Sequence, residues 1–143
     1  MRVEAWVRLW AWLRHRPPPR LGARGEAVAA RYLRRQGYAI VARQARTGFG
    51  ELDLVAVDRG VVVFVEVKTR RSDQAGHPAE AVDLRKQRRL ARAALAFLRQ
   101  HRLLEHPARF DVVAITWPAR ARRPVIEHIP HAFEPPGRGQ FLG

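Results

Sequence analysis

The feature that most restricts the fold is a pair of apolar segments separated by two residues. Glu51–Asp58 and Val61–Lys68 are rich in Val and Leu, and Arg59-Gly60 between them fits a two-residue hairpin loop. The second segment is almost continuously apolar, as expected of a central strand covered on both faces. The sequence therefore predicts a β-hairpin whose second strand lies inside a sheet with packing layers on both sides.

Helical and extended segments alternate along the rest of the chain. The spacing of apolar residues predicts helices over 25–36 and 79–102, a turn at 47–50, and further strands over 38–44, 109–117 and 125–129. This order predicts an α/β domain with a mixed central sheet flanked by helices. We expect this domain to span 21–130, with a basic, Trp-rich arm over 1–20 and an irregular tail over 131–143.

Charge and composition limit the kind of protein this is. The 143 residues include 27 Lys and Arg against 13 Asp and Glu, a formal net charge of +14, which favours nucleic acid or an acidic membrane surface as partner. The absence of Cys excludes disulfides, thiolate metal sites and thiol nucleophiles. There is no apolar run of about 18 residues, and Glu4 and Arg8 interrupt any signal peptide. We therefore expect a cytoplasmic protein.

The hairpin brings charged side chains together. Pairing the strands across the two-residue loop places Asp53 opposite Glu66 and Glu51 opposite Lys68, with all four side chains on one face. Two such carboxylates repel and lose hydration between apolar residues, which a shared proton or a divalent cation would relieve. Oxygen ligands without Cys suit Mg²⁺ or Mn²⁺. An ion-paired solvent face of an ordinary hairpin is the alternative interpretation.

An amine accompanies this acid pair. Lys68 projects from the same face as Glu66, where an ammonium or amine can orient water or stabilise charge that develops on a phosphate. Lys68 and Lys86 are the two lysines among the 27 basic residues. Unlike Arg, Lys can lose its proton near neutral pH when its surroundings lower its pKa. The pattern therefore fits metal-assisted hydrolysis of a phosphodiester.

Short motifs occur in a fixed order through the predicted domain. They are Gly25-Glu26, Ala29, Tyr32-Leu33, Gly37-Tyr38, Gly50–Leu54, Val63–Arg70, Gly76, Pro78, Ala81-Val82, Lys86-Gln87 and Arg109–Val113. From about Gly22 to Ala114 the chain resembles the YraN-like uncharacterised proteins, relatives of restriction-endonuclease-like and Holliday-junction-resolvase-like nucleases with a D-(x)n-E-x-K core. Gln44 departs from this resemblance, since the family typically has Asn there, and we expect an effect on strand-end geometry.

The resemblance implies a restriction-endonuclease-like core and a metal-dependent endonuclease acting on DNA, including branched or otherwise non-standard DNA. The roles it implies are metal ligands at Asp53, Glu66 and the backbone carbonyl of Val67, the catalytic lysine at Lys68, an additional acid at Glu26, and a supporting helix residue at Gln87. A resolvase of branched DNA would need two active sites. The resemblance therefore also implies a homodimer, with the arm over 1–20 as a candidate contact.

Several interpretations stay open at this stage. Four arginines lie on one face of the second predicted helix: Arg85, Arg89, Arg92 and Arg99. This face spans about 21 Å. It either follows backbone phosphates or is a plain solvated surface. The alternative function is a non-catalytic nucleic-acid-binding or assembly protein on a nuclease fold. A third is peripheral membrane attachment through 1–20.

The remaining polar residues have simpler interpretations. Glu51 is either a partner of Lys68 or a charge at a strand end. For Asp111 we expect a structural salt bridge or hydrogen bond. The residues His128, His131 and Glu134 are interpreted as solvated surface residues in preference to a zinc site, because Pro130 intervenes in a loose tail.

Overall fold

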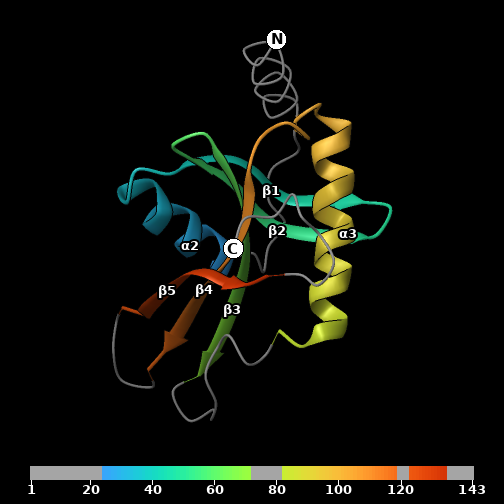
Figure 1. Ribbon diagram of the computed structural model, residues 1–143. Coiled ribbons are helices and arrows are strands. Elements are labelled where there is room, and N and C mark those ends of the chain that lie inside the picture. The colour runs from blue at the N-terminus through green and yellow to red at the C-terminus, as the bar shows by residue number, and fades with distance from the viewer. Residues whose placement is uncertain (1–23, 72–81, 119–122, 135–143) are drawn as a thin grey trace.

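The computed structural model describes residues 24–71, 82–118 and 123–134, so the predicted arm over 1–20 lies outside the described residues. Its elements are α2 (Arg24–Arg35), β1 (Ala39–Thr47), β2 (Gly50–Asp58), β3 (Val61–Arg71), α3 (Leu84–Gln100), β4 (Ala108–Trp117) and β5 (Val125–Phe133). The strands form one five-stranded sheet in the order β1-β2-β3-β4-β5, with β3 and β4 parallel and the other neighbours antiparallel (Figure 1). The predicted α/β domain with a mixed sheet is confirmed.

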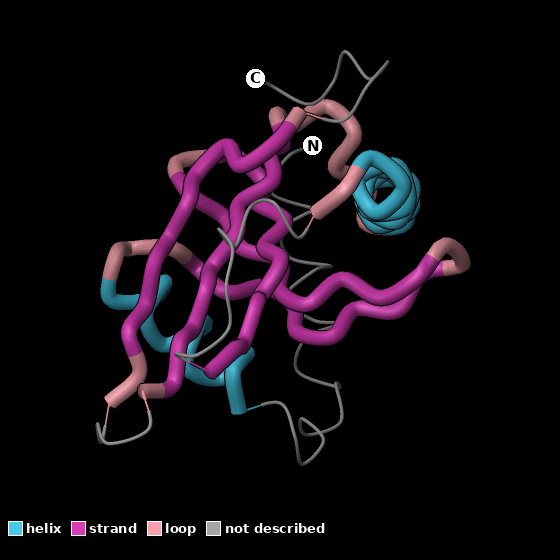
Figure 2. The backbone as a smooth tube through the Cα atoms, turned by 90° about the horizontal axis from the view of Figure 1, so that it is seen from below, coloured by secondary structure: helices cyan, strands magenta, loops and turns pink. Residues whose placement is uncertain are grey.

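The β2–β3 hairpin has the predicted register over its inner half. Asp58 pairs with Val61, and the ladder continues to Leu54 and Val65. The loop residues Arg59 and Gly60 have φ of 50° and 83°, as a two-residue turn with positive φ at both positions requires. Beyond Leu54, β2 leaves β3, and the β1–β2 hairpin continues as a two-stranded projection beside α3 (Figure 2).

The central strand β3 is covered on both faces, as predicted. Val62 and Phe64 pack in the cluster that contains the buried face of α3, whereas Val63 and Val65 pack in the cluster that contains α2. Figures 1 and 2 show the two helices on opposite faces of the sheet. Because side chains alternate along a strand, Glu66 and Lys68 follow Phe64 onto the α3 side. Among the described residues, no helix is long and apolar enough to cross a membrane.

A buried polar network connects β4 with β5 and with the start of β1. Asp111 accepts hydrogen bonds from Arg109 Nε (3.0 Å) and from the backbone N–H of His131 (3.2 Å), and lies 2.7 Å from His128 Nε2. Arg109 also donates to the Tyr38 hydroxyl at 2.8 Å. Burial alone would raise the pKa of Asp111, but contacts with His128 and Arg109 hold it below its ordinary value. The structural role expected for Asp111 is confirmed. The interpretation of His128 as a solvated surface residue is wrong.

Several element boundaries differ from the predictions: β1 and β3 each end three residues later than predicted, and the largest differences are in α3 and β5. Helix α3 begins at Leu84 instead of 79, because the Asp83 carboxylate accepts a hydrogen bond from the Lys86 backbone N–H at 2.8 Å and caps the helix. Strand β5 extends to Phe133, past the start of the predicted irregular tail at 131. It does so because Phe133 pairs with Phe110 and stacks on its ring at a centroid distance of 4.9 Å.

Gln44 lies inside β1, so the expected effect on the geometry of a strand end is wrong. It has a φ of 47°, in the left-handed region that non-glycine residues rarely adopt. Ala42 and Ala45, on either side of it, both pack in the cluster on the α3 side. In a regular strand these two positions would face opposite sides of the sheet. The backbone at Gln44 therefore rotates the outer part of the hairpin so that it stays in contact with α3.

Replacing Gln44 by Asn should stabilise the protein, because Asn tolerates the left-handed region better than Gln does. We expect the Gln44→Asn variant to gain about 0.5–1 kcal/mol, which is about 2–5 °C in midpoint temperature. Thermal unfolding followed by circular dichroism measures this. Gln36→Asn, at an exposed position without positive φ, is the control. A lower midpoint for Gln44→Asn would contradict the assignment of strain to this residue.

Candidate functional site

The site begins where β2 and β3 part. After the last pair, Leu54 and Val65, the next outward-facing N–H on this edge of β3 is that of Val67, and it donates to Asp53 Oδ2 at 2.9 Å. The N–H and C=O of one residue in a strand point to the same side. The carbonyl of Val67 therefore faces the same gap as the Asp53 carboxylate. One side chain from β2 and one backbone carbonyl from β3 thus lie at this open edge.

Asp53 and Glu66 lie close together at the edge where β2 leaves β3. Both line one small cavity together with the apolar side chains of Phe64 and Leu90. Glu66 is 8% exposed, and α3 contributes Lys86 and Leu90 to its surroundings.

The predicted pairing of Asp53 with Glu66 across the hairpin is wrong, because the ladder ends at Leu54 and Val65. The two carboxylates are nevertheless neighbours in apolar surroundings, and the charge of Glu66 reaches Asp53.

The surroundings make Asp53 hard to ionise. Burial raises its pKa most, the charge of Glu66 raises it further, and the charge of Glu26 adds a smaller contribution, whereas the hydrogen bond from Val67 opposes them. The resulting pKa of Asp53 is about 7. A carboxyl group in this state binds a proton near neutral pH. A cation that replaces the proton would bind the carboxylates of Asp53 and Glu66 and relieve the repulsion between them.

Two lysines contact the same oxygen of Glu66. Lys86 Nζ, from α3, lies 2.5 Å from Glu66 Oε1, and Lys68 Nζ, from β3, lies 3.3 Å from it. Burial and then the hydrogen bond with Lys86 lower the pKa of Lys68. Burial also acts to lower the pKa of Lys86, but its hydrogen bonds with Glu66 and Lys68 outweigh this and raise it. Lys86 therefore compensates the charge of Glu66, and Lys68 is the amine that loses its proton more readily.

Sequence reasoning gave Lys86 no role in the site. The composition of the sequence could have identified Lys86, because it is one of two lysines among the 27 basic residues. Its position on α3 relative to β3 depends on the packing of the helix on the sheet, which strand alternation does not determine.

The additional acid at Glu26 approaches the site from the other helix. Glu26 lies in the first turn of α2, its Oε2 is buried, and its charge reaches Asp53. A Cβ at Gly25 would overlap Thr69 Oγ1, so glycine at this position lets the first turn of α2 lie directly against the end of β3. The close approach of helix and strand thus holds Glu26 near the acid pair.

Two further predicted residues make other contacts. Gln87 Nε2 donates to the carbonyl of Val82 at 3.0 Å, so this side chain fixes the segment before α3 and makes no direct hydrogen bond to Asp53 or Glu66. The prediction that Glu51 stands opposite Lys68 is wrong, because β2 has left β3 at that point. Glu51 pairs with Arg46 of β1 at 3.7 Å, and both side chains are exposed.

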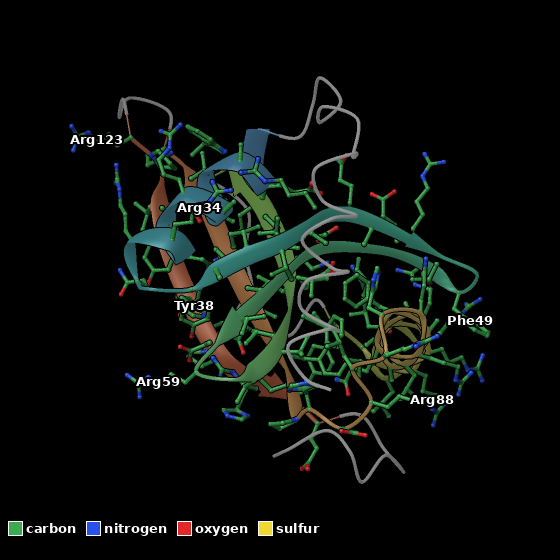
Figure 3. All side chains as sticks on the ribbon, turned by 90° about the horizontal axis from the view of Figure 1, so that it is seen from above. Arg34, Tyr38, Phe49, Arg59, Arg88 and Arg123 are labelled. Atoms are coloured by element: carbon green, nitrogen blue, oxygen red, sulfur yellow. The ribbon has the colours of Figure 1, made fainter. Side chains whose placement is uncertain are left out.

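A positively charged surface adjoins the acid pair along α3. A surface cavity of about 540 Å³ is lined, within the described part of the chain, by Asp83, Arg85, Lys86, Arg88, Arg89 and Arg92. Lys86 both lines this cavity and binds Glu66, so the cavity and the acids are neighbours. Arg85, Arg89 and Arg92 belong to the arginine face predicted from the sequence, whereas Arg88 does not. The fourth residue of that face, Arg99, is exposed further along the helix. Figure 3 shows Arg88 on the outer side of α3.

The donor set at this edge fits a hard divalent cation. Across residues 24–71, 82–118 and 123–134, no group of three or more His, Asp or Glu side chains could hold a metal ion. Mg²⁺ needs fewer protein ligands, since it is commonly held by one or two carboxylates together with waters and substrate phosphate. The carboxylates of Asp53 and Glu66 with the carbonyl of Val67 meet this requirement.

The chain is similar to a family model and to proteins that carry the name of that family. The sequence model of the uncharacterised protein family UPF0102 matches residues 25–115. A UPF0102 protein of Rhodopirellula baltica is 41% identical and covers 99% of this chain and 87% of its own length. A UPF0102 protein of Geobacter metallireducens is 49% identical over 80% of this chain and 92% of its own. One from Geotalea uraniireducens is 51% identical over 80% and 89%.

Because the pKa of Asp53 is raised in the folded protein, this residue lowers stability at high pH. The folded state keeps a proton that the unfolded chain releases between about pH 4 and pH 7, so stability falls as the pH rises through this range. We expect Asp53→Asn to raise the free energy of unfolding by about 2–4 kcal/mol at pH 8, with the gain shrinking toward pH 4.

Thermal unfolding across this pH range, in EDTA, measures the effect. Asp83→Asn is the matched control, because Asp83 is exposed and Asn caps a helix equally well. A gain for Asp53→Asn that stays constant with pH would show that Asp53 is an ordinary ionised carboxylate.

Proposed function

The chain belongs to the uncharacterised protein family UPF0102, and we propose that it is a divalent-metal-dependent endonuclease that hydrolyses phosphodiester bonds in DNA. The observation that carries the proposal is the proximity of Asp53 and Glu66 in one small cavity, with Lys68 on the same Glu66 oxygen that Lys86 contacts. Carboxylates that share a cation beside an amine are suited to phosphoryl chemistry.

The fold supports the same proposal. A mixed sheet with helices on both faces, and an acid pair on two consecutive antiparallel strands, is compatible with a restriction-endonuclease-like core. The family resemblance from about Gly22 to Ala114 includes these acidic positions. We therefore assign this core to the chain as part of the proposal.

Asp53, Glu66 and the carbonyl of Val67 would hold Mg²⁺ or Mn²⁺. When bound, the ion supplies a Lewis acid that polarises the scissile phosphate and activates water. Lys68 contributes an amine whose lowered pKa lets it accept a proton from the attacking water, or, when protonated, stabilise charge on the phosphate. Lys86, whose ammonium contacts Glu66, lies between the acids and the arginine-lined cavity, where it can reach a phosphate of the bound strand.

The arginines of α3 would hold the substrate through its backbone. Phosphate contacts from Arg side chains fix the position of nucleic acid without reading its sequence. The resemblance to resolvase-like nucleases extends the proposal to branched or otherwise non-standard DNA, for which a homodimer would supply two sites. Backbone binding next to the acid pair would bring a phosphodiester to the site in any of these substrates.

Removing an acid or the amine should abolish cleavage. We expect cleavage of single-stranded, duplex, flap or four-way-junction DNA in Mg²⁺ or Mn²⁺, and a loss of at least 100-fold in Asp53→Ala and in Lys68→Ala. Divalent-metal binding, measured by calorimetry, should disappear in Asp53→Ala and persist in Lys68→Ala. Gel-based cleavage assays on identically purified proteins measure the activity.

Glu51→Ala is the matched control, since it removes an exposed acid two residues away on the same strand. Cleavage that persists equally in Asp53→Ala would identify a contaminating nuclease. DNA binding that survives both substitutions, with no cleavage by the unmodified chain, would contradict the proposal and favour a non-catalytic binding protein. In that protein, the contacts of the two lysines with Glu66 would have a structural role.

The arginine surface of α3 should make binding sensitive to salt. We expect Arg89→Ala and Arg92→Ala each to weaken DNA binding similarly for all sequences and to reduce the slope of log K against log salt by about 1. Fluorescence anisotropy titrations over a range of NaCl concentrations measure the slope. Arg34→Ala, an exposed arginine on α2 across the sheet, is the control and should leave the slope unchanged. Equal effects of all three changes would place the binding surface elsewhere.

A further inference from the structure

We propose that Phe49 is a stacking surface for an unpaired base of the bound nucleic acid, so that the substrate carries single-stranded nucleotides beside the cleaved phosphodiester. This inference rests on the proposed nuclease function and specifies its class of substrate. It is carried by an exposed aromatic ring in a fixed turn that lies against Arg89, one of the residues that line the positively charged cavity.

The tip of the β1–β2 hairpin is a defined turn. Thr47 Oγ1 donates to the carbonyl of Gly50 at 2.8 Å and accepts a hydrogen bond from the backbone N–H of Phe49 at 3.1 Å. Gly50 has a φ of 128°, a conformation that glycine adopts readily. Although its backbone is fixed in this way, the Phe49 side chain is 53% exposed. The fold gains little from a large aromatic ring placed in water, so the ring is available to a partner.

The surroundings of this ring are positively charged. Arg89 packs against the turn, since a Cβ at Gly50 would lie 3.6 Å from its Cδ. Arg89 also lines the cavity beside the acid pair, and Arg46 projects from the same hairpin. Figure 3 shows Phe49 at the end of the hairpin and Arg88 on α3, both projecting on the same side of the molecule. The ring therefore lies where a strand held by these arginines would pass.

This combination favours an unpaired nucleotide over other occupants. An aromatic face stacks on any base whose own face is free, and bases inside a duplex are already stacked on one another. A second copy of this chain would bring the same arginines together, and facing like charges cost several kcal/mol. A single-stranded segment provides both phosphates for the arginines that line the cavity and a free base for Phe49.

The position of the ring relative to the acids indicates which nucleotide it contacts. Phe49 precedes Asp53 by four residues along the hairpin, which is about 13 Å at about 3.3 Å per strand residue. At about 3.4 Å per nucleotide in a stacked strand, this is about four nucleotides from the cleaved phosphate. Single-stranded character is therefore needed close to the cut, on the side toward the hairpin tip.

Binding without metal tests the inference separately from cleavage. Single-stranded oligonucleotides that carry 2-aminopurine at successive positions are titrated with the full chain in EDTA, and fluorescence quenching reports stacking. We expect Phe49→Ala to weaken single-strand binding about 5- to 100-fold and to abolish quenching, with less than a twofold effect on duplex binding. Phe49→Trp should retain both, and Phe49→Leu should lose quenching although it keeps an apolar side chain.

Leu104→Ala is the matched control, because Leu104 is also exposed (41%) but follows the far end of α3. Thermal unfolding of each variant confirms that it is folded. Three results would each overturn the inference. They are equal losses of binding to single-stranded and duplex DNA in Phe49→Ala, quenching that survives in Phe49→Ala, and a Phe49→Ala variant that loses binding to anionic vesicles but keeps its binding to DNA. The proposed function fails on a different result, the absence of metal-dependent cleavage, which this titration does not measure.

Discussion

The site depends on the parting of β2 from β3 after the pair of Leu54 and Val65. As long as two strands stay paired, their backbone groups satisfy one another and leave nothing for a ligand. Where β2 turns away, Val67 loses its neighbour in the ladder, and the Asp53 carboxylate accepts its N–H. The same divergence opens the edge that the Val67 carbonyl faces and carries the β1–β2 hairpin along α3. A local end of pairing thus creates a set of oxygen donors and places the hairpin tip beside the arginines.

Electrostatics links this edge to the rest of the charged surface. Two buried carboxylates raise the free energy of the ionised state. Lys68 and Lys86 offset part of this cost, because both contact one oxygen of Glu66. Because Lys86 also lines the arginine-rich cavity, it connects the surface suited to phosphates with the acids suited to a cation. In the proposed function, the arginines hold the polyanion and the acids hold the divalent cation.

The sequence predicted the hairpin and the acid pair because both depend on local rules. Arg59-Gly60 determines the loop, and the loop determines a register that runs as far as Leu54 and Val65 and so brings Asp53 and Glu66 close together. The rules fail where tertiary packing intervenes. Strand alternation extended the ladder to Glu51 and Lys68, whereas the rotation at Gln44 and the contact with α3 take β2 away before that point. Lys86 and the burial of His128 were missed for the same reason, since each depends on contact between elements distant in sequence.

Diffraction from crystals grown with Mn²⁺, measured at a wavelength where manganese scatters anomalously, would locate a cation at the acid pair. We expect one strong anomalous peak between the carboxylates of Asp53 and Glu66, next to the Val67 carbonyl, with the Lys86 ammonium moved away from Glu66. A map without a peak at that place, in which Lys86 still contacts Glu66 at saturating Mn²⁺, would contradict this expectation.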